Sequence, residues 1–242
     1  MKITPNTKAW DVLFRGREIE LSSLFSVGEK NTINYKGDIK TLLSSRPRVA
    51  IVGTKDISLY GITVTRKIID CLSQYDEKPV IISGFAMGVD TEAHRAALEK
   101  GLPTVAVVAT GLDTVYPFKN KQLAEYIETT TGCCIISQFP EATAPMAFNF
   151  LKRNHVIAAI ADVVIVVESK ERGGAIVTAK IAHSMDIPVF AVPGRIDDVR
   201  SAGCNDLIRK GVAKMFDMSF LESYAIGKKQ LAANRERSLP AR

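Results

Sequence analysis

The sequence predicts an α/β fold built on a doubly wound, mostly parallel sheet. Two observations lead to this prediction. Six short apolar runs in the middle of the chain are rich in β-branched residues, and each is bounded by Gly, Pro, Ser or Asp. Segments with helical spacing of apolar residues lie between these runs. Strands that alternate with helices over about 160 residues are typical of a parallel sheet with right-handed crossovers.

The six apolar runs are the expected strands, because near-continuous apolarity is typical of strands that are buried on both faces. They lie at residues 49–52, 80–82, 104–109, 133–136, 163–167 and 189–192. Val64, Ile68 and Tyr75 recur at helical spacing and define the first expected helix. The second is expected to begin at Asp90, a residue type that favours an N-cap, and to end before Gly101. The remaining helices are expected at about 120–127, 149–161, 174–184 and 205–210.

Length and composition are those of one large domain, or of one domain with short appendages. The chain has 242 residues, of which 46% are hydrophobic and 24% charged, and this balance excludes disorder as the main state. No apolar run approaches the roughly 18 residues of a membrane span, and residues 1–10 lack the apolar region of a secretory signal. The four cysteines show no C-x-x-C or metal-ligand spacing, which predicts reduced thiols in a cytoplasmic protein.

The chain is expected to divide into three parts. Residues 1–46 form an N-terminal extension whose fold the pattern leaves undetermined, residues 47–218 form the α/β domain, and residues 219–242 form a basic tail. The net charge of +6, with a pI of about 9.1, favours acidic partners such as nucleic acid. The tail is the most basic part, and it either contacts a phosphate backbone or is a solvated terminus.

Glycine-rich segments follow nearly every expected strand. They lie at residues 53–58, 83–90, 110–117, 168–174 and 193–195. Ligands bind outside the carboxyl ends of parallel strands, where glycines let backbone N–H groups approach closely and helix N-termini add positive potential. The pattern predicts an anion site, most simply a phosphate cradle, although a single glycine at such a place is usually only a turn former.

Standard catalytic and nucleotide-binding motifs are absent from the sequence. It contains no G-x-G-x-x-G, no Walker A and no G-x-S-x-G pattern. The histidines lack metal-ligand spacing and are expected to be structural or solvent-facing; they are His94, His155 and His183. Asp90, Asp113 and Glu168 are candidate acid–base groups, but capping a helix or fixing a loop explains Asp90 and Asp113 equally well. No nucleophile is paired with a base and no ligand spacing suits a metal, so we expect no catalytic residue and no metal. We expect no cofactor either.

Residues 148–154 combine aromatic and cationic side chains at the start of an expected helix. Phe148 and Phe150 stand close to Lys152 and Arg153 in the sequence. A phenylalanine can stack on a nucleic-acid base while Lys and Arg hold the adjoining phosphates. Alternatively, one phenylalanine belongs to the core and the cations are solvated. Spacing alone leaves both interpretations open.

A series of motifs also occurs in one order along the chain. It begins with G-T-K at 53–55, followed by Ser58 and Y-G at 60–61. Then come S-G-x-A-x-G-V-D at 83–90, G-x-D-x-x-Y-P at 111–117, F-x-x-R-N at 150–154, G-A-x-x-T-A at 174–179, P-G at 193–194 and S-x-G-C-N-x-L-I at 201–208. This collinear series runs from about residue 48 to 211 and resembles the motifs of the DprA/Smf (DNA-processing protein A) family.

The resemblance implies a Rossmann-like domain at residues 47–218 that binds single-stranded DNA and has no catalytic centre. It also implies a RecA-type recombinase as partner in natural transformation, and a homodimer. Carried over by position, Gly53, Thr54 and Lys55 would line the phosphate pocket, and Ser83, Gly84, Ala86 and Gly88 would offer backbone donors to it. Phe150 would stack on a base beside Lys152, Arg153 and Asn154. Ser58, Gly111, Gly173 and Gly174 complete the expected DNA- and phosphate-binding residues.

The sequence departs from the family pattern at three places and leaves one alternative open. The family turn has Arg where this chain has Lys55, which keeps the charge but loses the bidentate fork. The second Arg of the family's R-N-R is His155 here, and Gly173 replaces a Ser. The alternative is a nucleotide-binding sensor, or a nucleotide phosphoribohydrolase of the LOG type on the same fold. Those enzymes carry P-G-G-x-G-T and then a Glu, whereas residues 172–178 lack the Pro, the third Gly and the following Glu.

Overall fold

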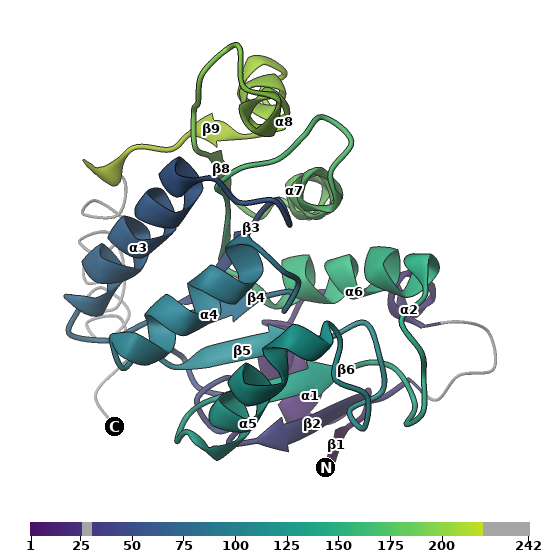
Figure 1. The fold of residues 1–242 in the computed structure, drawn as a ribbon. Coiled ribbons are helices and arrows are strands. Elements are labelled where there is room, and N and C mark those ends of the chain that lie inside the picture. Colours follow the sequence, from purple (N-terminus) through teal and green to yellow (C-terminus); the bar gives the residue numbers. More distant parts are fainter. Residues whose placement is uncertain (26–30, 220–242) are drawn as a thin grey trace, which may run out of the picture.

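The computed structural model describes residues 1–25 and 31–219, which form one nine-stranded sheet with helices on both faces (Figure 1). The strand order is β1-β2-β6-β5-β4-β3-β7-β8-β9. From β6 to β9 all neighbouring strands are parallel, whereas β2 is antiparallel to both β1 and β6. The prediction of a doubly wound, mostly parallel sheet is therefore confirmed.

All six predicted strands occur, and their bounds differ from the prediction by no more than two residues. They are β3 (Arg48–Val52), β4 (Val80–Ser83), β5 (Thr104–Val107), β6 (Cys134–Ser137), β7 (Val163–Val166) and β8 (Val189–Ala191). Every residue of these strands is buried, in agreement with their near-continuous apolarity. The last predicted strand residues at 108–109 and at 167 instead belong to the loops at the carboxyl edge of the sheet.

The six predicted helices also occur, with starts that differ from the prediction by up to six residues. They are α3 (Leu59–Ser73), α4 (Val89–Glu99), α5 (Lys121–Thr129), α6 (Ala147–Ile160), α7 (Gly174–Ser184) and α8 (Val199–Arg209). The predicted N-cap at Asp90 is wrong, because Gly88 is the N-cap of α4 and Asp90 lies buried in its first turn. Helix α8 begins six residues before the predicted start, because the Asp198 side chain accepts a hydrogen bond from Arg200 N at 2.9 Å.

The N-terminal residues join the same sheet and the same core. Strands β1 (Lys2–Ile3) and β2 (Ile33–Gly37) extend the sheet beyond β6, and helices α1 (Lys8–Leu13) and α2 (Leu21–Leu24) pack on its α6 face. The remaining short elements are η1 (Phe118–Asn120) and β9 (Lys214–Met215). The division into residues 1–46, 47–218 and 219–242 stays a prediction, and the basic tail from residue 220 on lies outside the described residues.

A buried arginine joins the N-terminal residues to the sheet. Arg48, at the start of β3, donates hydrogen bonds to the carbonyls of Val12 at 2.9 Å, Leu13 at 2.5 Å and Ile160 at 3.3 Å, and also to that of Leu42. Burial lowers the pKa of this guanidinium to about 9, with the positive charge of Arg15 as a further cause. One side chain thus connects α1, the segment before β3 and the end of α6.

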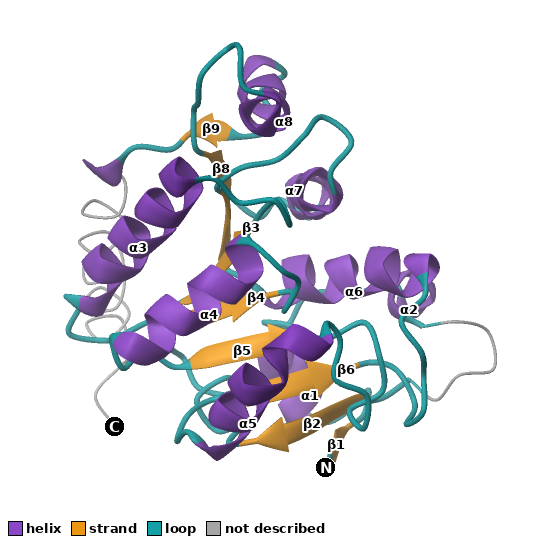
Figure 2. Cartoon of the chain, in the orientation of Figure 1, coloured by secondary structure: helices purple, strands orange, loops and turns teal. Residues whose placement is uncertain are grey.

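The chain reverses its winding direction at β3. Strands β4, β5 and β6 follow on one side of β3, and β7 and β8 follow on the other side. Helices α3, α4 and α5 cover one face of the sheet, and α6 and α7 cover the opposite face (Figure 2). In such a sheet the loops after the two strands at the reversal separate, which leaves a crevice at the carboxyl edge. The crevice here lies between β3 and β7.

Candidate nucleic-acid interface

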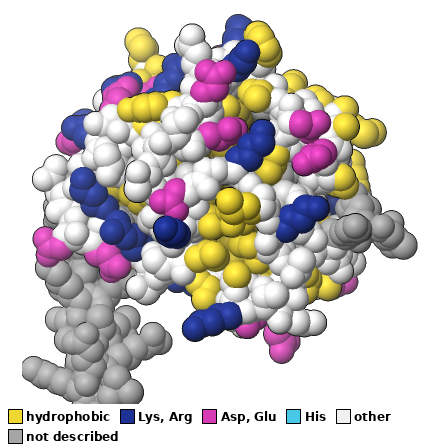
Figure 3. Space-filling view, turned by 90° about the horizontal axis from the view of Figure 1, so that it is seen from below, with side chains coloured by type: hydrophobic (Ala, Val, Ile, Leu, Met, Phe, Trp, Pro, Cys, Tyr) yellow, Lys and Arg dark blue, Asp and Glu magenta, His cyan; other side chains and the backbone are white. Residues whose placement is uncertain are grey.

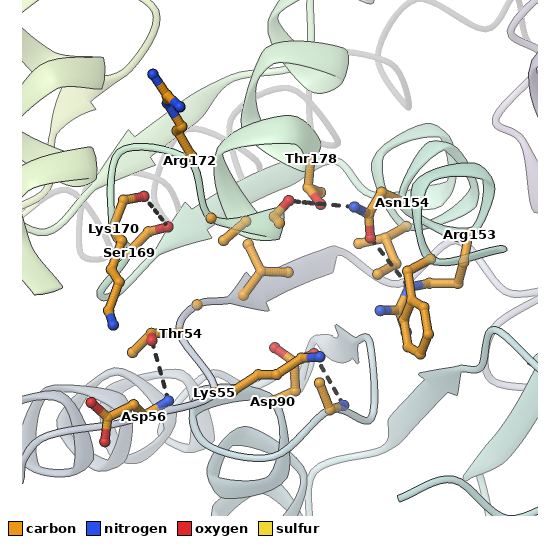
Figure 4. Close-up of a pocket in the computed structure, with 18 residues that line it drawn as sticks. Thr54, Lys55, Asp56, Asp90, Arg153, Asn154, Ser169, Lys170, Arg172 and Thr178 are labelled. Carbon is orange, nitrogen blue, oxygen red and sulfur yellow. Dashed lines mark hydrogen bonds between the residues drawn. The ribbon is translucent and has the colours of Figure 1, made fainter. Parts of the chain in front are cut away.

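A cleft of about 460 Å³ opens at the junction of β3 and β7 (Figure 4). The loop after β3 forms one wall, the loop after β7 with the start of α7 forms the other, and α6 closes one end. Nine of the predicted site residues line it: Gly53, Thr54, Lys55, Ala86, Phe150, Arg153, Asn154, Gly173 and Gly174. Residues more than 120 positions apart in the sequence therefore meet at one place, as the positions of the expected strand ends predicted.

A smaller hollow adjoins the cleft on the side of β4. Gly84, another predicted site residue, lines this hollow. Ser58, Ser83, Gly88, Gly111 and Lys152 line neither the cleft nor the hollow. The structure thus brings ten of the predicted residues together and places five elsewhere.

Ser58 builds the start of α3 instead of lining the cleft. Its hydroxyl caps the helix by accepting a hydrogen bond from Gly61 N at 3.1 Å. The same hydroxyl donates to Glu168 Oε1 at 2.5 Å, and the Ser58 N–H donates to Glu168 Oε2 at 3.0 Å. A Cβ on Gly61 would lie 2.3 Å from Glu168 Oε2, so only glycine fits there. The S-x-Y-G motif therefore joins α3 to a buried carboxylate beyond the end of β7.

Ser83 and Gly88 do not line the cleft, but they contact the segments that form its walls. The Ser83 hydroxyl donates to the carbonyl of Ile51 on the neighbouring strand at 2.6 Å. Gly88 has φ +79, and a Cβ there would lie 2.2 Å from the carbonyl oxygen of Thr54. Because only glycine tolerates both conditions, the loop before α4 can lie directly against the loop after β3. Gly88 thereby fixes the position of Thr54 in the cleft.

Phe150 lies where the cleft and the hollow meet, beside two cations. Its half-buried ring has the Lys55 Nζ at 5.2 Å and the Arg153 guanidinium carbon at 5.6 Å from its centroid. Both distances are within the range of cation–π attraction. Lys55 is exposed and Arg153 is buried, so the two cations act in different environments. Of these two cations, only Lys55 can reach a phosphate from solvent.

Arg153 is a structural cation, and the alternative interpretation in which both Lys152 and Arg153 are solvated is wrong, because Arg153 is 5% exposed and Lys152 is 8% exposed. Its guanidinium donates to the carbonyl of Gly84, and to that of Val107 at 2.7 Å. These carbonyls end β4 and β5, so the side chain closes the carboxyl edge of the sheet beneath the cleft. Burial lowers the pKa of Arg153, and the nearby carboxylate of Asp90 opposes this shift.

Asp90 forms part of the floor of the cleft. Its Oδ2 accepts a hydrogen bond from Ala86 N at 3.2 Å. Burial raises the pKa of this carboxyl group, while the positive charge of Arg153 acts in the opposite direction. A Cβ on Gly84 would lie within 2.8 Å of both side chains. Asp90 therefore holds the loop after β4 instead of capping α4.

Lys152 lies on a different side of α6 from Phe150. Its ammonium group is 5.2 Å from the centroid of Phe148, and both residues line a separate groove beside α2. Residues two positions apart on a helix point in nearly opposite directions, so Phe148 and Phe150 cannot share one surface. The structure therefore divides the aromatic and cationic segment between two places.

Gly111 lies in a loop that does not reach the cleft. A Cβ at this position would be 2.5 Å from the carbonyl oxygen of Pro140 and 2.6 Å from Asp113 Oδ1. The Asp113 carboxylate in turn accepts a hydrogen bond from Ala142 N at 2.8 Å. Gly111 thus lets two loops pack together, and Asp113 fixes a loop, which was one of the two roles expected for it.

Sequence reasoning missed two cations in the loop after β7. Lys170 and Arg172 are exposed and line the cleft, and neither forms an ion pair with any of the described residues. Figure 4 shows the Lys170 side chain extending from its loop toward Thr54 on the facing loop. Their position directly after an expected strand could have indicated them, but isolated cations in a loop form no motif that predicts a binding site. Asp56 is an exposed acid that also lines the cleft.

His94 and the four cysteines lie away from the cleft. His94 is buried, and its Nδ1 lies 2.7 Å from the Thr104 hydroxyl. Within residues 1–25 and 31–219, no cluster of His, Cys, Asp and Glu is suited to hold a metal ion. In the same part of the chain, no helix has the length and apolarity needed to span a membrane. The four cysteines all lie among the described residues, and none of them forms a disulfide.

Comparisons with known proteins agree with the motifs. The sequence profile of the family described as DNA recombination-mediator protein A matches residues 28–223. The DNA processing protein DprA of Streptococcus pneumoniae is 41% identical over 177 residues, which cover 73% of this chain and 60% of that protein. This chain thus spans only part of its relative's length.

Two solved structures have the same fold. The X-ray structure of DprA from Streptococcus pneumoniae has a TM-score of 0.75 and 36% identity, covering 89% of this chain and 70% of that one. A structure of DNA processing protein A from Helicobacter pylori, described for its single-stranded DNA binding mode, has a TM-score of 0.72 and 27% identity, covering 88% and 94%. Since the family profile matches well over half of the sequence, the chain belongs to the DNA recombination-mediator protein A family.

Proposed function

We propose that the cleft between β3 and β7 binds single-stranded DNA, without chemical turnover. One observation carries the proposal: the exposed Lys55 amine lies 5.2 Å from the ring of Phe150, in a cleft that Lys170 and Arg172 also line. Cations beside an aromatic ring suit a strand whose phosphates are neutralised and whose unpaired base stacks on the ring. Family membership and the single-stranded DNA binding of the Helicobacter pylori protein support it.

The same chemistry explains the expected preference for a single strand. Phe150 is available for stacking only to a base that has left a duplex, whereas Lys55 and the backbone N–H groups at the start of α7 can take phosphates of any strand. Every base has a π-face, so we expect little sequence preference. Each neutralised phosphate releases counterions, so we expect affinity to fall steeply as salt increases.

The arrangement of polar groups in the cleft favours binding over catalysis. Asp90 is buried and accepts a hydrogen bond from the backbone of Ala86. The Ser169 hydroxyl donates to the carbonyl of Lys170 at 3.0 Å, so no base activates it.

We infer that the bound strand passes to a RecA-type recombinase in the cytoplasm, in line with the family's description as a recombination mediator. We also infer that the protein acts as a homodimer.

Two substitutions test the site in a DNA titration followed by fluorescence anisotropy. Lys55→Ala should make the negative slope of log K against log salt less steep by about 0.7, the value for one phosphate of a single strand. Phe150→Ala should weaken binding by about 1–3 kcal/mol because a stacked base is lost. Lys67→Ala, which removes an exposed cation in the middle of α3, is the matched control. Unchanged affinity and slope in both test variants would contradict the assignment of the cleft.

A nucleotide-binding sensor is the second candidate, and the volume of the cleft favours it. About 460 Å³ is within the range of about 300–1,000 Å³ that small-molecule sites occupy. A thermal-shift screen with mononucleotides separates the two functions, because a ligand that binds only the folded state raises the Tm. Stabilisation by a mononucleotide without binding of oligo-dT would favour the sensor.

A further inference from the structure

The hollow beside the cleft continues the proposed DNA site. Lys55, Ala86 and Phe150 line both the cleft and the hollow, and the far side of the hollow is formed by Met87 and Tyr116. A DNA strand bound at Lys55 and Phe150 can therefore continue directly into the hollow. None of the motifs assigned a function to Met87 or Tyr116.

Tyr116 presents an aromatic ring at this continuation. The centroids of the Tyr116 and Phe150 rings are 5.8 Å apart, with an angle of 65° between the ring planes. This edge-to-face packing is a favourable arrangement for two aromatic rings. Tyr116 nevertheless stays 43% exposed, and its neighbour Met87 stays 36% exposed. The packing thus fixes the ring and still leaves a large part of the residue open to a ligand.

The loop that carries Tyr116 is held on both sides. Before it, the Asp113 carboxylate accepts a hydrogen bond from Ala142 N at 2.8 Å. After it, the Asn120 side-chain amide donates to the carbonyl of Phe85 at 3.1 Å, in the buried interior. A ring that is already positioned loses little conformational entropy when a base stacks on it. Tyr116 is therefore pre-organised as a stacking surface.

We propose that Tyr116 is a second base-stacking platform, so that the site holds two successive bases, one on Phe150 and one on Tyr116. This inference rests on the proposed function. Because the ring planes differ by 65°, two bases stacked on them turn away from each other. Only an unpaired strand can separate neighbouring bases in this way at small cost, so the second platform adds to the preference for single strands.

Three variants test this platform in anisotropy titrations with labelled oligo-dT. Tyr116→Ala should weaken binding about 5- to 150-fold, the effect of one lost stacking contact. Tyr116→Phe should bind like the wild type, because the ring is kept. Tyr126→Ala is the matched control, since Tyr126 is a 57% exposed tyrosine on α5 that lines neither the cleft nor the hollow. The salt slope should stay unchanged in all three, because no phosphate contact is removed.

A double variant separates a platform from a residue that only positions Phe150. If Tyr116 acts through Phe150 alone, Tyr116→Ala will have no further effect in a Phe150→Ala background at low salt. If it binds its own base, the loss will persist there. Wild-type affinity of Tyr116→Ala, or a loss that vanishes in the Phe150→Ala background, would overturn the inference and leave the proposed function standing. Absence of oligo-dT binding by the wild type would instead refute the proposed function.

Discussion

Arg153 combines a buried charge with two structural hydrogen bonds under the cleft. We predict that Arg153→Ala lowers the free energy of unfolding by about 3–5 kcal/mol, because the carbonyls of Gly84 and Val107 lose their donor and the buried Asp90 carboxyl group loses a nearby positive charge. Urea denaturation measures the effect. Arg95→Ala, an exposed cation on α4, should change stability by less than about 0.5 kcal/mol. Equal stability of the two variants would show that Arg153 has no structural role.

His94 makes stability depend on pH in the weakly acidic range. Burial lowers its pKa from 6.5 to about 3, so the folded state stays unprotonated while the unfolded state takes up a proton below pH 6.5. The unfolded state binds more protons, so stability falls as pH falls. Between pH 6.5 and 5 the loss should be about 2 kcal/mol.

Stability curves of His94→Gln and His183→Gln test this dependence. The first variant should lose it, and the second should keep it because His183 is exposed. The raised pKa of Asp90 acts with the opposite sign in both proteins, so the difference from the wild type isolates His94. The same pH slope in His94→Gln and in the wild type would contradict the assignment.

At the scale of residues, motif spacing predicted which segments form the cleft but not how their side chains are oriented. The aromatic and cationic pattern at 148–154 predicted a helix start, yet which phenylalanine faces the ligand depends on the position of α6 against the sheet. Lys170 and Arg172 were not predicted, because residues in a loop show no helical or strand periodicity that would indicate which way their side chains face. Burial of Arg153 depends on free carbonyls at the ends of β4 and β5, which only the folded sheet brings together.

At the scale of elements, the loop behind the cleft requires glycine at position 88, whereas position 174, which lines the cleft, tolerates a side chain. Gly88→Ala should lower the free energy of unfolding by about 2–4 kcal/mol, because φ is +79 and the new Cβ would lie 2.2 Å from Thr54 O. Gly174→Ala should leave stability unchanged, because a Cβ there meets nothing within 4 Å.

The Gly174→Ala variant also tests the cleft directly. Its methyl group would enter the proposed phosphate site at the start of α7, so DNA affinity should fall about tenfold, as for one lost charged hydrogen bond. Thermal melting and anisotropy titration of both variants check these outcomes. Wild-type affinity of a stable Gly174→Ala protein would exclude this end of the cleft from the site.

Buried elements were easier to predict from the sequence than short or exposed ones. The six predicted strands are buried along their whole length and therefore appear as apolar runs. Strands β1 and β9 have two residues each, too few to show any period. Helix α8 starts at Val199 in a stretch that contains Ser201 and Gly203, so propensity alone did not indicate its first turns.

At the scale of the whole molecule, net charge does not locate the site. The face seen in Figure 3 carries Lys and Arg interspersed with Asp and Glu around a group of hydrophobic side chains. The net charge of +6 is therefore not concentrated as a single basic patch on this face. The location follows instead from topology, because the reversal of strand order at β3 separates the loops after β3 and β7.

We propose above all that the cleft binds single-stranded DNA through phosphates and stacked bases. Its most direct test is a fluorescence-anisotropy titration of the wild-type protein with labelled oligo-dT and with the matching duplex, at two salt concentrations. We predict tighter binding of the single strand, with a slope of log K against log salt of about −0.7 for each phosphate contacted. No binding of oligo-dT at low salt, or equal affinity for the duplex, would contradict it.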